Sequence, residues 1–225
     1  MEQKCALVLG ASGLTGNYCL PYLLESESYK KVIALVRRPI DIQHPKILVA
    51  VVDFDLTSTM EKYYEGVDDV FCCLGTNIQK AGSLSTFRRV DFHIPVEAAN
   101  IASGHGVKQF LAISAHEANN HSSNNYLRIK GEMEAGLAQF NFSALHIFRQ
   151  QHLTEDLGEV YETKKSGNFF SGIFGSKNIT HLSKSIKISP KILAAAMVHV
   201  AQLNKAGKNL YNAAQILELS GMETG

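Results

Sequence analysis

Short runs of consecutive apolar residues punctuate the first half of the chain, and helical patterns lie between them. Each run has the length expected of a strand that is buried on both faces of a sheet. The five runs are residues 5–9, 31–36, 47–52, 69–74 and 107–114. Between them, apolar residues recur about every 3.6 positions, as on one face of a helix. This alternation predicts an α/β fold, doubly wound around a mainly parallel sheet.

The second half of the chain continues this pattern less regularly. The sequence predicts a helix at 126–140, a sixth strand at 144–149, a short edge strand at 185–188, a helix at 190–202 and a final short element at 209–219. Ser189 and Pro190 suit the N-cap and the first residue of the helix at 190–202. Residues 153–174 show little periodicity, which is typical of a substrate lid or of any irregular connection. Within the helical pattern at 85–103, Pro95 predicts a kink or a break.

Length and composition limit the class of protein. A chain of 225 residues, 45% of them apolar, suits one globular domain with a small C-terminal extension and with substrate-side elements mainly within residues 150–225. The balance of 22 basic and 21 acidic residues gives no sign of a nucleic-acid-binding surface. No apolar run approaches the ~20 residues that cross a bilayer, and the first strand begins where a signal peptide would lie. We therefore expect a cytoplasmic protein without a membrane span.

Four cysteines and a histidine-containing loop bear on metal and redox chemistry. Cys5, Cys19, Cys72 and Cys73 fall in predicted strands or a helix and form no C-x-x-C pair, so we expect buried thiols rather than disulfides. The loop after the fifth strand contains an H-E-x-x-x-H arrangement beginning at His116. This spacing misses the i, i+4 histidine pair of a zinc-protease helix, so we expect no metal site.

A glycine turn follows the first apolar run directly. Gly10, Gly13 and Gly16 are spaced three apart, and a helical pattern begins at Leu14. A strand, a glycine turn and a helix form the opening of a dinucleotide-binding unit, in which helix N-terminal amides face a pyrophosphate. Glycine is needed there because a Cβ would block the approach of the backbone. A tight turn without a ligand is the alternative.

Residues after the second, third and fourth strands indicate the cofactor. Arg37 and Arg38 end the second strand, where NAD-specific proteins carry an acidic residue for the ribose and NADP-specific ones an arginine for the 2′-phosphate. We therefore expect NADP(H), with a solvated basic pair as the alternative. Asp53 follows the third strand, where an adenine edge can be met. The small residues Gly75 and Thr76 after the fourth strand allow backbone to approach a flat ligand, although an ordinary turn looks the same.

A tyrosine and a lysine in the helix after the fifth strand are candidates for proton transfer. Tyr126 and Lys130 are four residues apart, which places both side chains on one helix face. A nearby ammonium lowers the pKa of a phenol, which can then protonate the oxygen of a carbonyl that receives hydride. Ser114, at the end of the fifth strand, is expected to share that oxygen. A second Tyr-x-x-x-Lys pair begins at Tyr161, and its position beyond the sixth strand favours the first pair.

Several motifs together resemble a known family. They are Leu-Gly-Ala-Ser-Gly-Leu-Thr-Gly (9–16), Val-Asp-Phe (52–54), Phe-Cys-Cys-Leu-Gly-Thr (71–76), Arg-Val-Asp (89–91), Tyr-Leu-Arg-Ile-Lys-Gly-Glu (126–132) and Phe-Arg (148–149). The chain resembles the atypical short-chain dehydrogenase/reductases over about residues 6–153. The resemblance implies a Rossmann sheet with NADPH held by Ser12, Gly13, Leu14, Thr15, Arg37, Arg38, Leu74, Gly75, Tyr126, Lys130 and Leu153. Phe54, beside Asp53, is a further candidate for the cofactor site.

The sequence thus predicts an NADPH-binding reductase that transfers hydride to a carbonyl or quinone-type small molecule. Tyr126, Lys130 and Ser114 are the predicted catalytic residues, and a small-molecule substrate is the predicted partner. The alternative is a non-catalytic regulator that uses NADP(H) occupancy to control a protein partner. A protein partner or a second copy of the chain stays open.

Overall fold

The computed structural model describes residues 3–150 and 188–221. In this part of the chain, seven strands form one sheet in the order β3-β2-β1-β4-β5-β6-β7, and every neighbouring pair is parallel. The strands are β1 (Lys4–Leu9), β2 (Tyr29–Val36), β3 (Ile47–Val51), β4 (Asp69–Cys72), β5 (Gln109–Ala115), β6 (Ala144–Gln150) and β7 (Gly207–Tyr211). The order reverses between β1 and β4, so the carboxyl ends of these strands flank the crevice where open α/β sheets bind ligands. The predicted doubly wound fold is confirmed.

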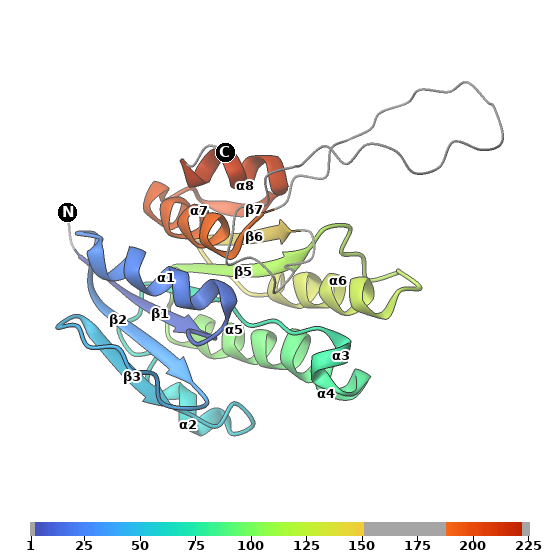
Figure 1. Cartoon of the computed structure of the whole chain (residues 1–225), viewed down its shortest axis with the longest axis horizontal. Coiled ribbons are helices and arrows are strands. Elements are labelled where there is room, and N and C mark those ends of the chain that lie inside the picture. Colours follow the sequence, from blue (N-terminus) through green and yellow to red (C-terminus); the bar gives the residue numbers. More distant parts are fainter. Residues whose placement is uncertain (1–2, 151–187, 222–225) are drawn as a thin grey trace, which may run out of the picture.

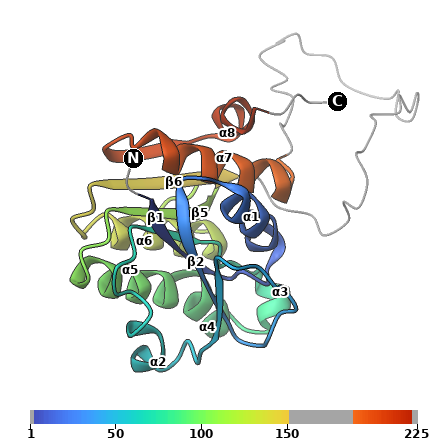
Figure 2. The same ribbon diagram turned by 90° about the vertical axis from the view of Figure 1, so that its left-hand side faces the viewer.

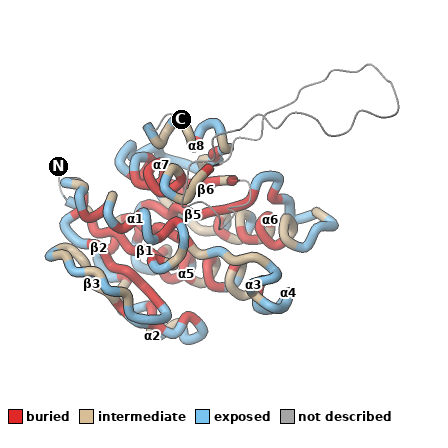
Figure 3. The backbone as a smooth tube through the Cα atoms, viewed as in Figure 1, coloured by how far each residue is buried: buried red, intermediate tan, exposed pale blue. Residues whose placement is uncertain are grey.

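Helices cover both faces of the sheet (Figures 1 and 2). They are α1 (Leu14–Glu25), α2 (Thr57–Glu61), α3 (Ile78–Ala81), α4 (Leu84–Arg88), the π-helical segment η1 (Arg89–His93), α5 (Ile94–Gly104), α6 (Asn125–Leu137), α7 (Pro190–Leu203) and α8 (Ala213–Ser220). Helices α1, α7 and α8 pack on one face, and α2, α5 and α6 pack on the other. Residues of the inner strands alternate between these two clusters, so β1, β2, β4, β5 and β6 are largely buried on both faces, whereas the edge strands β3 and β7 are partly exposed (Figure 3).

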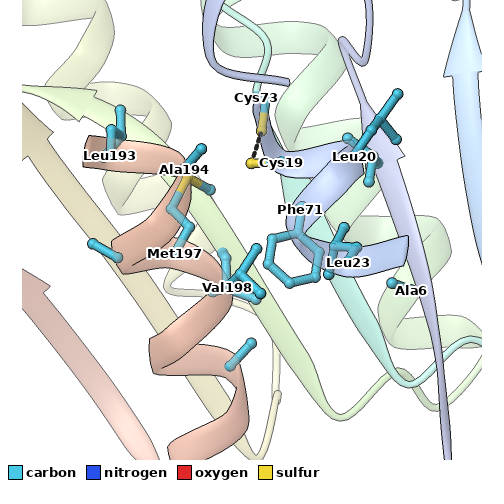
Figure 4. Close-up of a cluster of buried hydrophobic side chains, with 14 of the residues drawn as sticks. Ala6, Cys19, Leu20, Leu23, Phe71, Cys73, Leu193, Ala194, Met197 and Val198 are labelled. Carbon is cyan, nitrogen blue, oxygen red and sulfur yellow. Dashed lines mark hydrogen bonds between the residues drawn. The ribbon is translucent and has the colours of Figure 1, made fainter. Parts of the chain in front are cut away.

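The layer formed by α1 and α7 fixes the helix that follows the glycine turn. Leu20 and Leu23 of α1 lie beside Met197 and Val198 of α7, around Phe71 of β4 (Figure 4). Burying one such side chain contributes about 1.5–3 kcal/mol, so this layer holds α1 firmly against the sheet. The N-terminus of α1, which is the predicted phosphate site, is therefore attached to a rigid core.

The cysteines lie inside the same core. All four are free and buried, as predicted from their positions in strands and a helix. The sulfur atoms of Cys19 in α1 and Cys73 after β4 are 3.7 Å apart and form a hydrogen bond (Figure 4). Burial raises the pKa of the Cys72 thiol to about 12, so this thiol stays protonated at neutral pH.

Proline 95 breaks the long helix predicted at 85–103, as expected. Pro95 has no N–H to donate to the carbonyl of Asp91, so regular α-helical bonding cannot pass this point. The helix widens into η1 just before the proline, and the Ile94 amide donates to the carbonyl of Arg89, five residues earlier. Such π-turns are frequent at functional sites. Here the wide turn places Asp91 completely inside the protein.

The C-terminal region departs from one prediction. The single short element predicted at 209–219 is wrong, because the structure has both β7 and α8 there. Asn212 separates them by capping α8, in a capping box with Gln215. The helix predicted at 190–202 is confirmed as α7, with Ser189 as its N-cap. Predictions for residues 153–174 and 185–187, including Leu153, Tyr161 and Lys165, lie outside the described residues.

A buried polar network joins the amino-terminal halves of β4, β5 and β6. The Asp69 carboxylate accepts hydrogen bonds from the Tyr29 hydroxyl at 2.7 Å and from the Gln109 side-chain amide at 2.9 Å. The ring of His146 lies 3.2 Å from Gln109 Oε1 and 3.1 Å from the Tyr211 hydroxyl. Because Oε1 can only accept, His146 Nε2 donates, and Nδ1 accepts from Tyr211. A neutral His146 therefore satisfies the network, and burial disfavours the charged ring.

Protonation of His146 is expected to destabilise the fold in acid. Burial, with the nearby Lys205 charge, lowers the pKa of His146 to about 4, from about 6.5 in an unfolded chain. The stability is complete above pH 6.5 and is lost as pH falls toward 4, because the unfolded chain then binds a proton that the folded chain excludes. Lowering the pKa of this buried ring from about 6.5 to about 4 corresponds to about 3 kcal/mol.

Urea denaturation at pH 7 and pH 4.5 measures this effect. The fall in the free energy of unfolding between these pH values should be smaller by ~2–3 kcal/mol in His146→Gln than in the wild type. His121→Gln, in the exposed loop before α6, is the matched control and should behave as the wild type does. If the free energy of unfolding depends on pH equally in His146→Gln and the wild type, His146 is not the group whose protonation destabilises the fold.

Candidate active site

The glycine turn after β1 is as tight as its sequence predicts. Gly10 has φ of +75°, in the left-handed region, and its carbonyl accepts from the Gly13 amide at 2.8 Å. A Cβ on Gly16 would lie 2.2 Å from the Gly10 carbonyl oxygen, and one on Gly10 would lie 3.0 Å from the carbonyl oxygen of Cys73. The absence of side chains thus allows α1 and the end of β4 to approach the turn closely.

The first turn of α1 has the properties of an anion site. Gly13 is the N-cap and supplies no side-chain hydrogen bond to the free amides of the helix. Thr15 is only 2% exposed, and its hydroxyl oxygen has no hydrogen-bond partner in the described part of the chain. Exposed Ser12 and Leu14 flank it. Free helix amides, the helix dipole and an unsatisfied buried hydroxyl fit a pyrophosphate group.

The predicted adenosine-side residues lie at the carboxyl ends of β2 and β3, next to β1. Arg37 and Arg38 follow β2 and are exposed, so their guanidinium groups are accessible to a phosphate. Asp53 is also exposed, and its carboxylate accepts from the Asp55 amide at 2.9 Å. Phe54 is buried below this loop, with 8% of its surface exposed. The fold therefore gathers these residues on the side of the crevice opposite β5 and β6.

The loop after β4 connects to a buried carboxylate that sequence analysis did not assign to the site. Gly75 is exposed and Leu74 is half-buried, as a ligand-facing turn requires. The Thr76 amide donates to Asp91 Oδ2 at 2.9 Å. Asp91 has no exposed surface. Its position in the helical pattern was a usable signal, because it takes an inward position, four residues after Phe87 and three before Ile94.

Tyr126 and Lys130 share one face of α6, as predicted. The ammonium of Lys130 lies 2.7 Å from Asp91 Oδ1 and donates to the Ile113 carbonyl of β5 at 3.3 Å. Tyr126 is half-buried, and its ring stacks on Phe87 with 5.5 Å between centroids. Asn124 caps the helix by accepting from the Tyr126 and Leu127 amides. The cap and the stacked ring fix the phenol at the amino end of α6.

Electrostatics at this pair differ from the predicted pattern in one respect. Burial raises the pKa of Tyr126 above its usual value, the Asp91 carboxylate adds to this, and Lys130 only partly opposes it. The expected lowering of the Tyr126 pKa is therefore wrong. Burial is the largest influence on Lys130 and would lower its pKa, but the Asp91 carboxylate, with smaller contributions from Tyr126 and Cys72, raises that pKa overall. The pair consequently holds a protonated phenol beside a charged ammonium at neutral pH.

Ser114 lies in a different hydrogen-bond cluster. Its hydroxyl donates to Glu134 Oε1 at 2.5 Å, and Arg149 donates to both oxygens of the same carboxylate, at 2.9 and 2.6 Å. A serine hydroxyl has one proton to donate, so this bond must exchange before Ser114 can bind a substrate oxygen. Its catalytic role stays a prediction.

A cleft of about 740 Å³ lies on the flank of α6 beside this cluster. Its lining residues are Glu117, Ala118, Asn119, Asn120, Gly131, Glu134, Ala135 and Arg149. A Cβ on Gly131 would lie 2.2 Å from the Asn120 amide nitrogen, so the loop rests directly on the helix. Tyr126 and Lys130 are absent from the lining, which separates this cleft from the crevice at the glycine turn.

The fold and the glycine turn together define a dinucleotide-binding protein of the Rossmann type. A family model described as NAD(P)H-binding matches residues 10–178, which is well over half of the chain. The chain therefore belongs to the NAD(P)H-binding family, and the relationship predicted from its motifs is confirmed. Among residues 3–150 and 188–221, no helix is long and apolar enough to cross a membrane.

Named relatives extend this assignment. The chain is 36% identical over 152 residues to Protein HTATIP2 of Rattus norvegicus, a match that covers 66% of this chain and 62% of the rat protein. It is 30% identical over 180 residues to Protein FMP52-2, mitochondrial, of Scheffersomyces stipitis, with 75% and 79% of the two chains covered. The match thus spans less than two thirds of the rat protein.

Solved structures share the fold at low sequence identity. The oxidoreductase ylbE from Lactococcus lactis superimposes with a TM-score of 0.63 at 17% identity, covering 96% of this chain and 95% of the other. MoeE5 in complex with UDP-glucuronic acid and NAD gives 0.66 at 15% identity, covering 92% and 75%. At these identities the likeness concerns the fold, which is that of NAD-binding oxidoreductases.

Proposed function

We propose that the chain is an NADPH-dependent reductase of the short-chain dehydrogenase/reductase type, acting on a carbonyl or quinone-type small molecule. The observation that carries the proposal is the buried arrangement of Tyr126, Lys130 and Asp91 at the same sheet edge as the glycine turn. A module that only binds a dinucleotide has no use for a protonated phenol held beside a charged ammonium.

The residues divide the work between binding and proton transfer. The amides around Gly13 and the Thr15 hydroxyl would hold the pyrophosphate, and Arg37 with Arg38 would hold the 2′-phosphate. When bound, NADPH supplies the hydride. Tyr126 donates a proton to the substrate oxygen as negative charge develops there, and Lys130 stabilises the resulting phenolate.

NADPH consumption with a panel of aldehydes, ketones and quinones tests the proposal. Turnover of at least one class is expected. Tight NADPH binding without turnover across the panel would instead support the regulatory alternative, in which cofactor occupancy controls a protein partner. That outcome would remove the reductase assignment and leave the binding site intact.

Replacing Arg37 is expected to reduce the preference for NADP(H) over NAD(H). Arg37→Asp removes a charge-assisted hydrogen bond, worth about 1.5–3 kcal/mol, and adds repulsion toward a phosphate. The dissociation constant of NADPH, measured by fluorescence titration, should rise roughly 10- to 100-fold while that of NADH changes little.

Lys31→Asp is the matched control for this change. Lys31 is exposed on the same strand but lies near its amino end, and the substitution alters net charge equally. It should leave the NADPH affinity close to that of the wild type. Unchanged NADPH affinity in Arg37→Asp, or an equal loss in both variants, would exclude Arg37 as the phosphate ligand.

A cytosolic location and a protein partner or second copy also remain proposals. Four buried free thiols are typical of a reducing compartment. The FMP52 relatives carry the word mitochondrial in their names, so the mitochondrion is the specific competing location. Fractionation of cells that express the full chain with a C-terminal tag distinguishes the two locations.

A further inference from the structure

One carboxylate joins the proposed proton donor pair to the proposed cofactor loop. Asp91 has no exposed surface, yet both of its oxygens are engaged. Oδ1 lies 2.7 Å from the Lys130 ammonium, and Oδ2 accepts from the Thr76 amide at 2.9 Å. A Cβ on Gly75 would lie 3.6 Å from Oδ1 and 3.8 Å from the Lys130 nitrogen. The loop after β4 therefore rests directly on the ion pair.

Two groups from different elements hold the lysine head. The Lys130 ammonium forms an ion pair with Asp91 Oδ1 of η1 at 2.7 Å and donates a hydrogen bond to the Ile113 carbonyl of β5 at 3.3 Å. Tyr126 lies one helical turn before Lys130 on the same face of α6. The ion pair and the hydrogen bond therefore restrict where the ammonium can lie relative to the phenol.

We propose that Asp91 is a positioning residue that fixes Lys130 and the Gly75–Thr76 turn in one geometry, so that proton delivery and cofactor binding depend on the same carboxylate. This inference rests on the proposed function of the Tyr126 and Lys130 pair. Asp91 lies in the π-turn before Pro95, on the inward face of the helix. Asp91 would act through its two partners, Lys130 and the Thr76 amide.

A neutral residue in place of Asp91 cannot fulfil this role. A buried charge that loses its partner is strongly destabilised, and a lysine responds by releasing its proton. The titratable groups that face Lys130 are Asp91 from η1, Tyr126 from α6 and Cys72 from β4. Of these three, only Asp91 is negatively charged at neutral pH. Without it, burial lowers the pKa of Lys130.

The pH dependence of NADPH affinity in Asp91→Asn tests the inference. In the wild type, Lys130 stays charged and the dissociation constant should be nearly constant from pH 6 to pH 8.5. In Asp91→Asn, burial favours the neutral amine, so affinity should fall with rising pH, by roughly 10- to 100-fold where the charge-assisted contact is lost. The pKa of Tyr126 should change as well. It is measured by ultraviolet titration, as the difference between proteins with Tyr126 and with Tyr126→Phe.

Glu132→Gln is the matched control, because Glu132 lies on α6 and pairs with Arg88 and Arg128 away from Lys130. It should keep the flat profile of the wild type. A folded Asp91→Asn variant with that same flat profile would overturn the inference. Should Asp91→Asn not fold, hydrogen exchange of the wild-type Thr76 amide decides: protection supports the anchored turn, and exchange at the rate of an unstructured chain overturns it.

Binding is measured without turnover, so the two assignments fail separately. A wild-type protein that reduces no carbonyl or quinone, but whose Asp91→Asn variant shows the pH-dependent loss of affinity, would refute the reductase and support the positioning role. Turnover in the wild type together with a pH-independent NADPH affinity in Asp91→Asn would support the reductase and refute the positioning role.

Discussion

Tyr126→Phe is expected to lower the turnover number for NADPH-dependent carbonyl reduction by ~10²–10⁴ while NADPH still binds. The substitution removes one hydroxyl from a ring whose stacking on Phe87 is unaffected. The phenolic proton is needed only when charge develops on the substrate oxygen. Its loss therefore raises the activation barrier of the reduction without weakening the binding of the cofactor phosphates. The dissociation constant of NADPH should stay within about threefold of the wild type.

The electrostatics of the site indicate which protonation state acts. Burial and Asp91 raise the pKa of Tyr126, so the donor form is present across neutral pH. Lys130 does not create the acid in this structure; it stabilises the phenolate that forms when the proton leaves. We therefore expect turnover in the reductive direction to fall only at alkaline pH, as the phenol itself titrates.

Tyr161→Phe is the control for this prediction, because Tyr161 begins the second Tyr-x-x-x-Lys pair in the chain. It should retain wild-type turnover. Full activity in Tyr126→Phe, or a loss confined to Tyr161→Phe, would transfer the assignment to the second pair. Steady-state kinetics and NADPH titration of both variants, with any substrate found in the panel, provide the measurement.

Features that depend on neighbouring residues in the sequence were predictable. Six of the strands were predictable as short apolar runs, because the strands of a parallel sheet covered on both faces need them. The glycine turn was predictable because its three glycines sit between a strand and a helix. The seventh strand, β7, reads Gly-Lys-Asn-Leu-Tyr and is mostly exposed at the edge of the sheet. Its pairing with β6 comes from the tertiary fold, which no local pattern encodes.

Contacts between residues that are distant in the sequence were harder to predict. The sequence placed Tyr126 and Lys130 together through helical spacing, but their carboxylate partner is 39 positions before Lys130, in a helix distorted by a later proline. Ser114, whose catalytic role stays a prediction, has a partner that spacing could not indicate. Its position at the end of β5 favoured a substrate contact, whereas its hydroxyl bonds to Glu134. That bond depends on how α6 lies over the strand, so spacing along the chain gave no sign of it.

Gly16→Ala is expected to destabilise the protein and to abolish most of its NADPH affinity. The added Cβ would lie 2.2 Å from the Gly10 carbonyl oxygen, 2.8 Å from the Gly10 carbonyl carbon and 2.9 Å from Ala11 Cα. All three are backbone atoms, so no side-chain rotation relieves the overlap. Helix α1 must move away from the turn, and overpacking of this kind costs up to about 3 kcal/mol.

Two measurements follow from that displacement. Thermal unfolding should shift downward by roughly 6–12 °C, since each kcal/mol corresponds to about 2–4 °C in a protein of this size. The NADPH dissociation constant should rise more than about tenfold, because the amides at the start of α1 no longer converge on the pyrophosphate. The loss of NADPH affinity should persist at temperatures where the variant is fully folded. This would show that the loss comes from the altered site and not from unfolding.

Gly104→Ala is the matched control, because it makes the same chemical change at the end of helix α5. A Cβ on Gly104 meets no atom within 4 Å. Alanine suits a helix better than glycine by about 0.5–1 kcal/mol, so the melting temperature should stay constant or rise slightly, with NADPH affinity unchanged. The melting temperature should therefore fall in Gly16→Ala and stay constant or rise in Gly104→Ala. Wild-type stability and affinity in Gly16→Ala would show that the close approach of α1 to the turn is not what holds the dinucleotide.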